Sequence, residues 1–115
     1  MKIIIYGTTP SKKNSKIISC RGNKPCLFPS KNYTEWHKDA LLQLTGKKEI
    51  NSNKLTLTFY AKDNRKFDLT NKAESIMDTL VDKGLIADDN YSIISVLNLI
   101  FGGVDPKSPR CEIEY

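Results

Sequence analysis

The spacing of apolar residues along the chain predicts a series of short β-strands. Apolar and polar residues alternate in Lys54–Tyr60, which places Leu55, Leu57 and Phe59 on one face of a strand. A turn around Gly22 separates two further short segments and favours a β-hairpin there. The predicted strands are Lys2–Tyr6, Lys16–Cys20, Pro25–Phe28, Lys54–Tyr60, Ser92–Phe101 and Cys111–Tyr115.

Two longer segments carry apolar residues at helical spacing. Ser30–Thr45 ends before Gly46, and Leu69–Lys83 ends before Gly84, because glycine commonly follows the last turn of a helix. The apolar positions of the first helix are Tyr33, Trp36, Ala40, Leu41 and Leu44, and those of the second are Leu69, Ala73, Ile76, Met77 and Leu80. Each helix is therefore expected to bury one face.

The order strand, hairpin, helix, strand, helix, strand, strand predicts an α+β domain over residues 1–115, with a mixed β-sheet and two helices. Gly7–Asn14 and Gly102–Arg110 contain the prolines and glycines expected of loops. Ser92–Phe101 is apolar on both faces, so it is either a central buried strand or a surface that contacts a second molecule.

The composition is that of an ordinary globular domain. Of the 115 residues, 39% are hydrophobic and 27% charged, and no apolar run approaches the length of about 20 residues that crosses a bilayer. The first apolar stretch is too short for the core of a signal peptide. Cys20, Cys26 and Cys111 are odd in number and lack metal-site spacing, which favours reduced thiols. We therefore expect a cytoplasmic protein without membrane association.

The net charge of +5 favours binding to a polyanion, and the charges are unevenly placed. Basic residues gather in the N-terminal half, whereas acidic residues gather between Asp63 and Asp89. Lysine and small polar side chains contact phosphates without reading base sequence. The residues expected to contact DNA are Lys12, Lys13, Asn14, Lys16, Arg65, Lys66, Asn71 and Lys72. The alternative is that these residues are simply solvated.

The second helix has an acidic face. At about 100° per residue, an arc of about 80° holds Asn71, Glu74, Asp78 and Asp82. Asp68 stands at the start of the helix, and Asp88 and Asp89 join this face if the chain turns back after it. Carboxylates held together repel one another, which favours a bound cation. Oxygen ligands without His or Cys favour Mg²⁺, Mn²⁺ or Ca²⁺ over Zn²⁺, and we expect Mg²⁺, with Mn²⁺ as a substitute.

The acidic residues also have an interpretation that involves no metal. Acidic residues along an exposed helix face are usually solvated, and Asp68 is a suitable residue to cap the helix N-terminus. Asp88-Asp89-Asn90 is typical of a turn, since Asp and Asn side chains bond to nearby backbone groups. The pattern alone leaves the choice open.

Asp68–Asn90 resembles the RusA family of Holliday junction resolvases. That family carries an Asp-x-Asp-Asn motif, a lysine and an aspartate on the following helix, and an Asp-Asp pair before a strand. The residues that match are Asp68 and Asn71 in the first motif, Asp78 on the helix, and Asp88 with Asp89 in the pair. The loop Pro10–Asn14 is similar to the family's Pro-Ser-x-Asn loop, and Pro109 before the last strand also fits.

Two positions depart from the family pattern. The second aspartate of the motif is Thr70 in this chain, and the helix lysine is Glu74. Because these residues lie one helical turn apart, they are neighbours on the surface. We hypothesise that Glu74 replaces the missing carboxylate, while Lys72 or a lysine of the N-terminal loop supplies the missing positive charge.

The resemblance implies a homodimer that nicks four-way junctions or other branched DNA with Mg²⁺, leaving a 5′-phosphate and a 3′-hydroxyl. It also suggests a phage or prophage origin. The expected catalytic residues are Asp68, Glu74, Asp78 and Asp89, and the expected metal ligands are these four with Asp88. Three alternatives remain: a catalytically inactive DNA-binding relative, a nuclease for another branched or single-stranded substrate, and a basic interaction protein without enzymatic activity.

Overall fold

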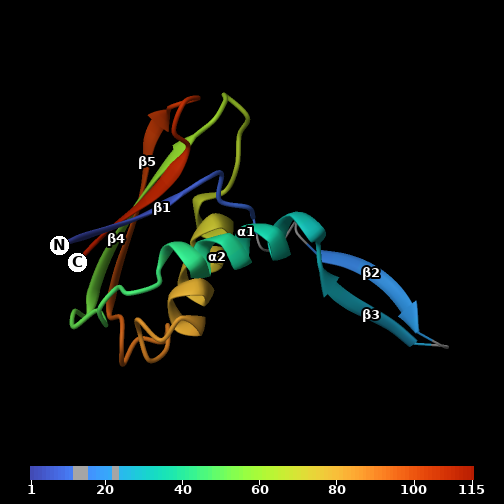
Figure 1. Cartoon of the computed structure of the whole chain (residues 1–115), viewed down its shortest axis with the longest axis horizontal. Coiled ribbons are helices and arrows are strands. Elements are labelled where there is room, and N and C mark those ends of the chain that lie inside the picture. The colour runs from blue at the N-terminus through green and yellow to red at the C-terminus, as the bar shows by residue number, and fades with distance from the viewer. Residues whose placement is uncertain (12–15, 22–23) are drawn as a thin grey trace.

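The computed structural model describes residues 1–11, 16–21 and 24–115. In chain order the elements are β1 (Lys2–Tyr6), β2 (Lys16–Arg21), β3 (Lys24–Pro29), α1 (Lys31–Gln43), β4 (Lys54–Ala61), α2 (Leu69–Asp82), β5 (Val96–Val104) and β6 (Arg110–Glu114). A four-stranded mixed sheet with two helices confirms the predicted α+β class. The hairpin β2–β3 is also confirmed, and it extends away from the sheet (Figure 1).

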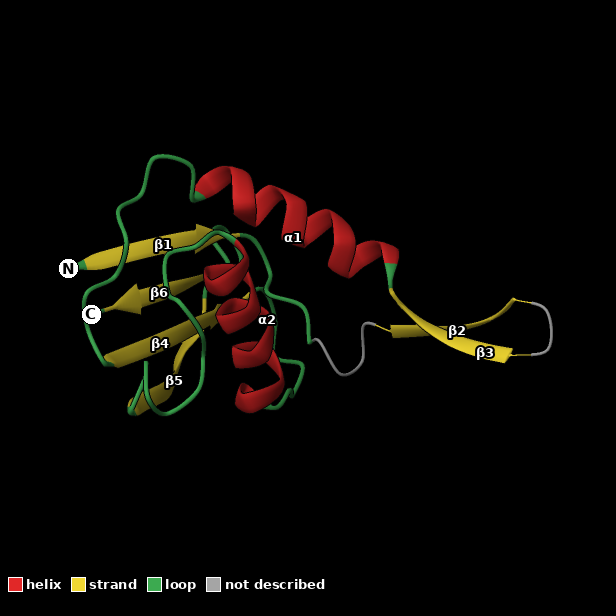
Figure 2. Cartoon of the chain, turned by 90° about the horizontal axis from the view of Figure 1, so that it is seen from below, coloured by secondary structure: helices red, strands yellow, loops and turns green. Residues whose placement is uncertain are grey.

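The strands of the sheet lie in the order β1-β6-β4-β5 (Figure 2). β6 pairs antiparallel with β1 and β4, whereas β4 and β5 run parallel. Two parallel strands cannot be joined by a tight turn, because the chain must first return to the end of the sheet at which it started. The segment from α2 to the start of β5 makes this return, so it passes along one face of the sheet.

The face under the helices forms the hydrophobic core. Along β4, Leu55, Leu57 and Phe59 are buried, as their alternation predicted. The partners of Leu57 and Phe59 on β6 are Ile113 and Cys111, which are buried as well. Buried residues of α1 and α2, including Trp36, Ala40, Ile76 and Leu80, complete the cluster. Both helices lie over this one face of the sheet (Figure 2).

The opposite face of the sheet carries a network of charged residues. Glu112 accepts hydrogen bonds from Lys2 Nζ at 2.8 Å and from Arg110 Nε at 2.7 Å, and these bonds lower the pKa of its carboxyl group. The Arg110 guanidinium also lies 3.9 Å from the centroid of the Tyr60 ring. Gly102 leaves room for that ring, because a Cβ at this position would lie 2.7 Å from it. This face is therefore ordered by polar contacts without a covering helix.

Two predictions about the last strands are wrong. β5 begins at Val96 because Ser92–Ile94 form a turn in which the backbone N–H groups of Ile93 and Ile94 donate to the Asn90 carbonyl. Gly102 and Gly103 continue β5 instead of forming a loop, and Gly103 pairs with Tyr60 after a shift in register. Of the two alternatives left open for this strand, the structure excludes the central buried one, because β5 is the edge of the sheet and exposes Ile100 and Phe101 by 46% and 50%.

Within the described ranges, no helix is long and apolar enough to span a membrane.

Candidate functional site

α2 presents different chemistry on each side. One side is buried against the sheet. Next to it, Lys72, Ser75 and Thr79 face the N-terminal loop and α1: Lys72 Nζ donates to the Thr9 carbonyl, and Ser75 Oγ donates to the Pro10 carbonyl at 2.7 Å. On the opposite flank, Thr70 and Glu74 face the region of β5. The helix therefore separates two possible binding regions, which are described in turn.

Glu74 and Asp89 line the same cavity of about 240 Å³, which we call the acidic cavity. Thr70 also lines it, and the remaining lining residues are Ala73, Met77, Leu97 and Leu99. The crossover explains this meeting of residues that are distant in sequence. α2 returns the chain to the end of the sheet at which β4 begins, and the segment after Gly84 leads from there into β5, so Asp89 of this segment and Leu97 of β5 line one cavity with α2.

Asp89 lies in an environment that disfavours its charge. Burial raises the pKa of the Asp89 carboxyl group, and so do a hydrogen bond with Asp88, the charge of Asp88 and the charge of Asp78. Asp88 is held in a turn: its Oδ1 accepts from the Asp89 N–H at 2.7 Å, and its Oδ2 accepts from Asn90 Nδ2 at 3.0 Å. A cation beside Asp89 would relieve this repulsion.

The acidic arc predicted on α2 is divided by its tertiary neighbours. At its far edge, Asp82 Oδ2 lies 3.0 Å from His37 Nε2, while His37 Nδ1 lies 3.0 Å from Thr79 Oγ1. Asp82 therefore links α2 to α1 and faces away from the acidic cavity. The sequence pattern carries no signal for this link, because His37 and Asp82 are 45 residues apart and lie on different helices.

Asp68 lies at the other end of the helix from Asp78, about 15 Å away along the axis at about 1.5 Å per residue. It accepts a hydrogen bond from Asn71 Nδ2 at 3.2 Å and lines a separate hollow with Phe101 and Val104. Among the described residues, no group of three or more Asp, Glu, His or Cys side chains is arranged to hold a metal ion. Mg²⁺ commonly takes only one or two carboxylates and completes its shell with water and substrate phosphate.

A second cavity, of about 260 Å³, lies on the other flank of α2, and we call it the basic cavity. It is formed by the loop after β1, the segment between β4 and α2, and Lys72. Its cationic lining residues are Lys62, Arg65, Lys66 and Lys72, and its hydroxyl-bearing lining residues are Thr8, Thr9 and Ser11. Asp63 also lines it.

Of the residues expected to contact DNA, Arg65, Lys66 and Lys72 are brought together in the basic cavity. Lys12, Lys13 and Asn14 lie outside the described residues, and Lys16 opens β2. Thr9 and Lys62 also line this cavity, although they were not among the residues expected to contact DNA. One available signal was the spacing of Lys72, Ser75 and Thr79, which places three polar side chains together on a mostly buried helix and indicates a polar partner there.

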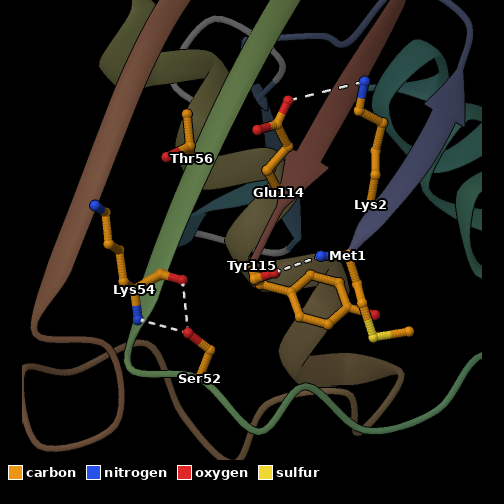
Figure 3. Close-up of a pocket in the computed structure, with 7 residues that line it drawn as sticks. All are labelled: Met1, Lys2, Ser52, Lys54, Thr56, Glu114 and Tyr115. Atoms are coloured by element: carbon orange, nitrogen blue, oxygen red, sulfur yellow. Dashed lines mark hydrogen bonds and ion pairs between the residues drawn. The ribbon is translucent and has the colours of Figure 1, made fainter.

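A wider hollow of about 590 Å³ lies at the edge of the sheet near both termini. Figure 3 shows that its polar groups are engaged with one another: Met1 N donates to the Tyr115 carbonyl, and Ser52 Oγ bonds with the Lys54 backbone. Lys2 lies 3.8 Å from Glu114. Its charged side chains are those of Lys2, Lys54 and Glu114. It therefore has neither the pair of carboxylates of the acidic cavity nor the four cationic side chains of the basic cavity.

No protein family model and no curated protein matches this chain.

Proposed function

We propose that the protein is a Mg²⁺-dependent endonuclease that acts on branched DNA in the cytoplasm, in the manner of the RusA family. The observation that carries the proposal is that Glu74 and Asp89 line one cavity, together with Thr70. The resemblance suggests carboxylate ligands at positions 70 and 89, and we hypothesised that Glu74, one helical turn from Thr70, replaces the carboxylate that is missing there. The net charge of +5 supports DNA as the polyanion.

In this proposal Glu74 and Asp89 are the protein ligands of the ion. Asp88 and Asp78 act from nearby, since their charges raise the pKa of Asp89 and thereby increase the benefit of a bound cation. When bound, Mg²⁺ supplies an activated water as the nucleophile and stabilises the leaving oxygen of the phosphodiester. Asp68, at the N-terminal end of α2, lines a separate hollow with Phe101 rather than the acidic cavity, so it is assigned to substrate contact rather than to this ion.

One observation favours a second candidate, a branched-DNA-binding relative without catalytic activity. Thr70 lines the acidic cavity at the position where the family motif has an aspartate. A hydroxyl group binds Mg²⁺ less strongly than a carboxylate does, so the cavity holds fewer charged ligands than the motif specifies. The two candidates differ in whether Mg²⁺ produces nicks.

Substituting Glu74 by glutamine tests the proposal. We expect Glu74→Gln to reduce Mg²⁺-dependent nicking of a synthetic four-way junction by about a hundredfold, because it removes a charged ligand while keeping the shape of the side chain. Adding Thr70→Asp to this variant should raise its nicking rate about tenfold, since the second substitution returns a carboxylate to the same cavity. The measurement is the single-turnover nicking rate with Mg²⁺ and with EDTA.

Glu35→Gln on the exposed side of α1 is the matched control and should nick at the wild-type rate. Fork, flap and duplex substrates in the same assay define which branched structure is cut. A wild-type protein that binds the junction but never nicks it supports the inactive relative. A Glu74→Gln variant with full activity excludes Glu74 as a ligand.

The resemblance also implies a homodimer, and we propose β5 as its interface. β5 is an uncharged edge strand with exposed apolar residues, including Ile100 and Phe101. An antiparallel pairing of β5 with its own copy would have two-fold symmetry and would match a two-fold substrate. We expect sedimentation velocity at micromolar concentrations to show a dimer that Ile100→Lys converts to a monomer. A monomeric wild type under these conditions rules out the dimer.

A further inference from the structure

The basic cavity has features that the metal site does not use. Its Lys72 side chain is half-buried, and burial lowers the pKa of its ammonium group, with a further contribution from the nearby charge of Lys62. Lys72 Nζ donates to the Thr9 carbonyl and lies 4.3 Å from the centroid of the Phe67 ring. An ammonium group has three donors, so this position has room for a further acceptor.

Thr9 provides a second and independent observation. The residue is only 4% exposed, and its Oγ1 has no hydrogen-bond partner among the described residues. A buried hydroxyl without a partner destabilises a fold by about 1 to 3 kcal/mol, so such groups usually have a ligand or water beside them. Thr9 lines the same cavity as Lys72, and its carbonyl accepts from Lys72 Nζ, so this buried hydroxyl belongs to a residue of the cavity wall.

The charge of this space selects an anion. Four cationic side chains line it together with one carboxylate, that of Asp63. This carboxylate is engaged by Arg65, whose backbone N–H donates to Asp63 Oδ1 at 3.0 Å and whose Nε lies 3.6 Å from Oδ2. In the described part of the chain, no carboxylate forms an ion pair with Lys62, Lys66 or Lys72, which leaves an excess of positive charge.

We infer that the basic cavity binds one phosphate group of a nucleic-acid backbone, with Lys72 and the Thr9 hydroxyl as its inner contacts. The tetrahedral anion offers several acceptor oxygens, so one group can accept from Thr9, Lys72 and a surface lysine together. The identification of the phosphate as part of DNA rests on the proposed function. The cavity then anchors the backbone on the flank of α2 opposite the acidic cavity and fixes which phosphodiester reaches Glu74 and Asp89.

The test measures binding without cleavage. Fluorescence anisotropy of a labelled junction is recorded in EDTA over a range of salt concentrations. We expect Lys72→Gln to raise Kd about tenfold and to reduce the slope of log Kd against log salt by about one, as loss of one phosphate contact requires. Thr9→Val removes a single uncharged hydrogen bond and should raise Kd about threefold.

Two further variants separate binding from folding. Lys62→Gln replaces a lining residue whose side chain makes no hydrogen bond or ion pair with the described residues, so it should weaken binding while leaving the unfolding temperature unchanged. Lys54→Gln lies at the start of β4, outside this cavity, and serves as the matched control. We expect its Kd to stay within about twofold of the wild type.

A titration with inorganic phosphate, followed by amide NMR shifts, locates the contact. We expect Thr9 and Lys72 to shift and the junction to displace the phosphate. Phosphate binding that the junction does not displace would overturn the assignment to nucleic acid, and unchanged affinity in Lys72→Gln and Thr9→Val would overturn the site itself. The binding assay contains no Mg²⁺ and is therefore independent of cleavage. If the protein binds DNA through this cavity but does not nick it in the separate assay with Mg²⁺, only the nuclease proposal is refuted.

Discussion

Asp89→Asn should lower the rate of Mg²⁺-dependent junction nicking by about a thousandfold, which corresponds to about 4 kcal/mol in the activation free energy. The substitution removes the carboxylate that the loop between α2 and β5 contributes to the acidic cavity, while the asparagine side chain keeps the size of the aspartate. A second effect of opposite sign should accompany this loss. Because desolvation and the neighbouring charges of Asp88 and Asp78 raise the pKa of Asp89, the neutral amide should raise the unfolding temperature slightly in metal-free buffer.

These two readouts are measured on the same protein samples. Mg²⁺ should raise the unfolding temperature of the wild type, because an ion that binds only the folded state stabilises it, and this shift should disappear in Asp89→Asn. Asp39→Asn, which changes an exposed aspartate on α1, is the control and should retain both the activity and the shift. If Asp89→Asn nicks normally, the proposed site is wrong. If Mg²⁺ shifts neither protein, the acidic residues are merely solvated.

Phe59→Ala should lower the free energy of unfolding by about 4 kcal/mol. Phe59 is 2% exposed on the inner face of β4, between Cys111 of β6 and Phe101 of β5. Truncating a buried aromatic ring removes its transfer free energy and leaves a cavity that the sheet can only partly close. Since a domain of this size is stable by about 5 to 15 kcal/mol, the loss should be plain in urea unfolding at equilibrium.

Phe101 is the matched control, because it is the register partner of Phe59 on the neighbouring strand. It is 50% exposed and contacts the Phe67 ring edge-on at 5.9 Å between centroids. At protein concentrations too low for β5 to pair with a second copy, Phe101→Ala should therefore cost only about 1 kcal/mol. Phe59→Leu, with a smaller expected loss, is available if the alanine variant does not fold. Equal losses for Phe59→Ala and Phe101→Ala would contradict the edge position of β5.

The elements that local patterns specify were predictable from the sequence. β4 alternates apolar and polar residues, and its inner side chains are buried as expected. α2 has a continuous apolar stripe and ends before Gly84, whose φ of 78° suits glycine. In both cases the periodicity of the side chains matches the geometry of the element, so no knowledge of its neighbours is needed.

The candidate site depended on contacts between distant segments, which periodicity does not record. The arc on α2 grouped Glu74 with Asp82, but the first faces the acidic cavity and the second contacts His37. Glu74 and Asp89 line one cavity because α2, the following loop and β5 lie side by side, and this arrangement is a property of the whole sheet. Ser92–Ile94 resembled a strand in composition, yet Asn90 accepts their backbone N–H groups in a turn.

The pairing of β1 with β6 also constrains how the protein folds during synthesis. Lys2 is the register partner of Glu114, and Ile5 that of Cys111, so the first strand completes its pairing only with the last one. Closing so long a loop is slow, because the entropy of the whole intervening chain is lost before the contact forms. On the ribosome, the apolar strand Lys2–Tyr6 therefore stays without its sheet partner until β6 has emerged, although β4, α2 and β5 can assemble earlier.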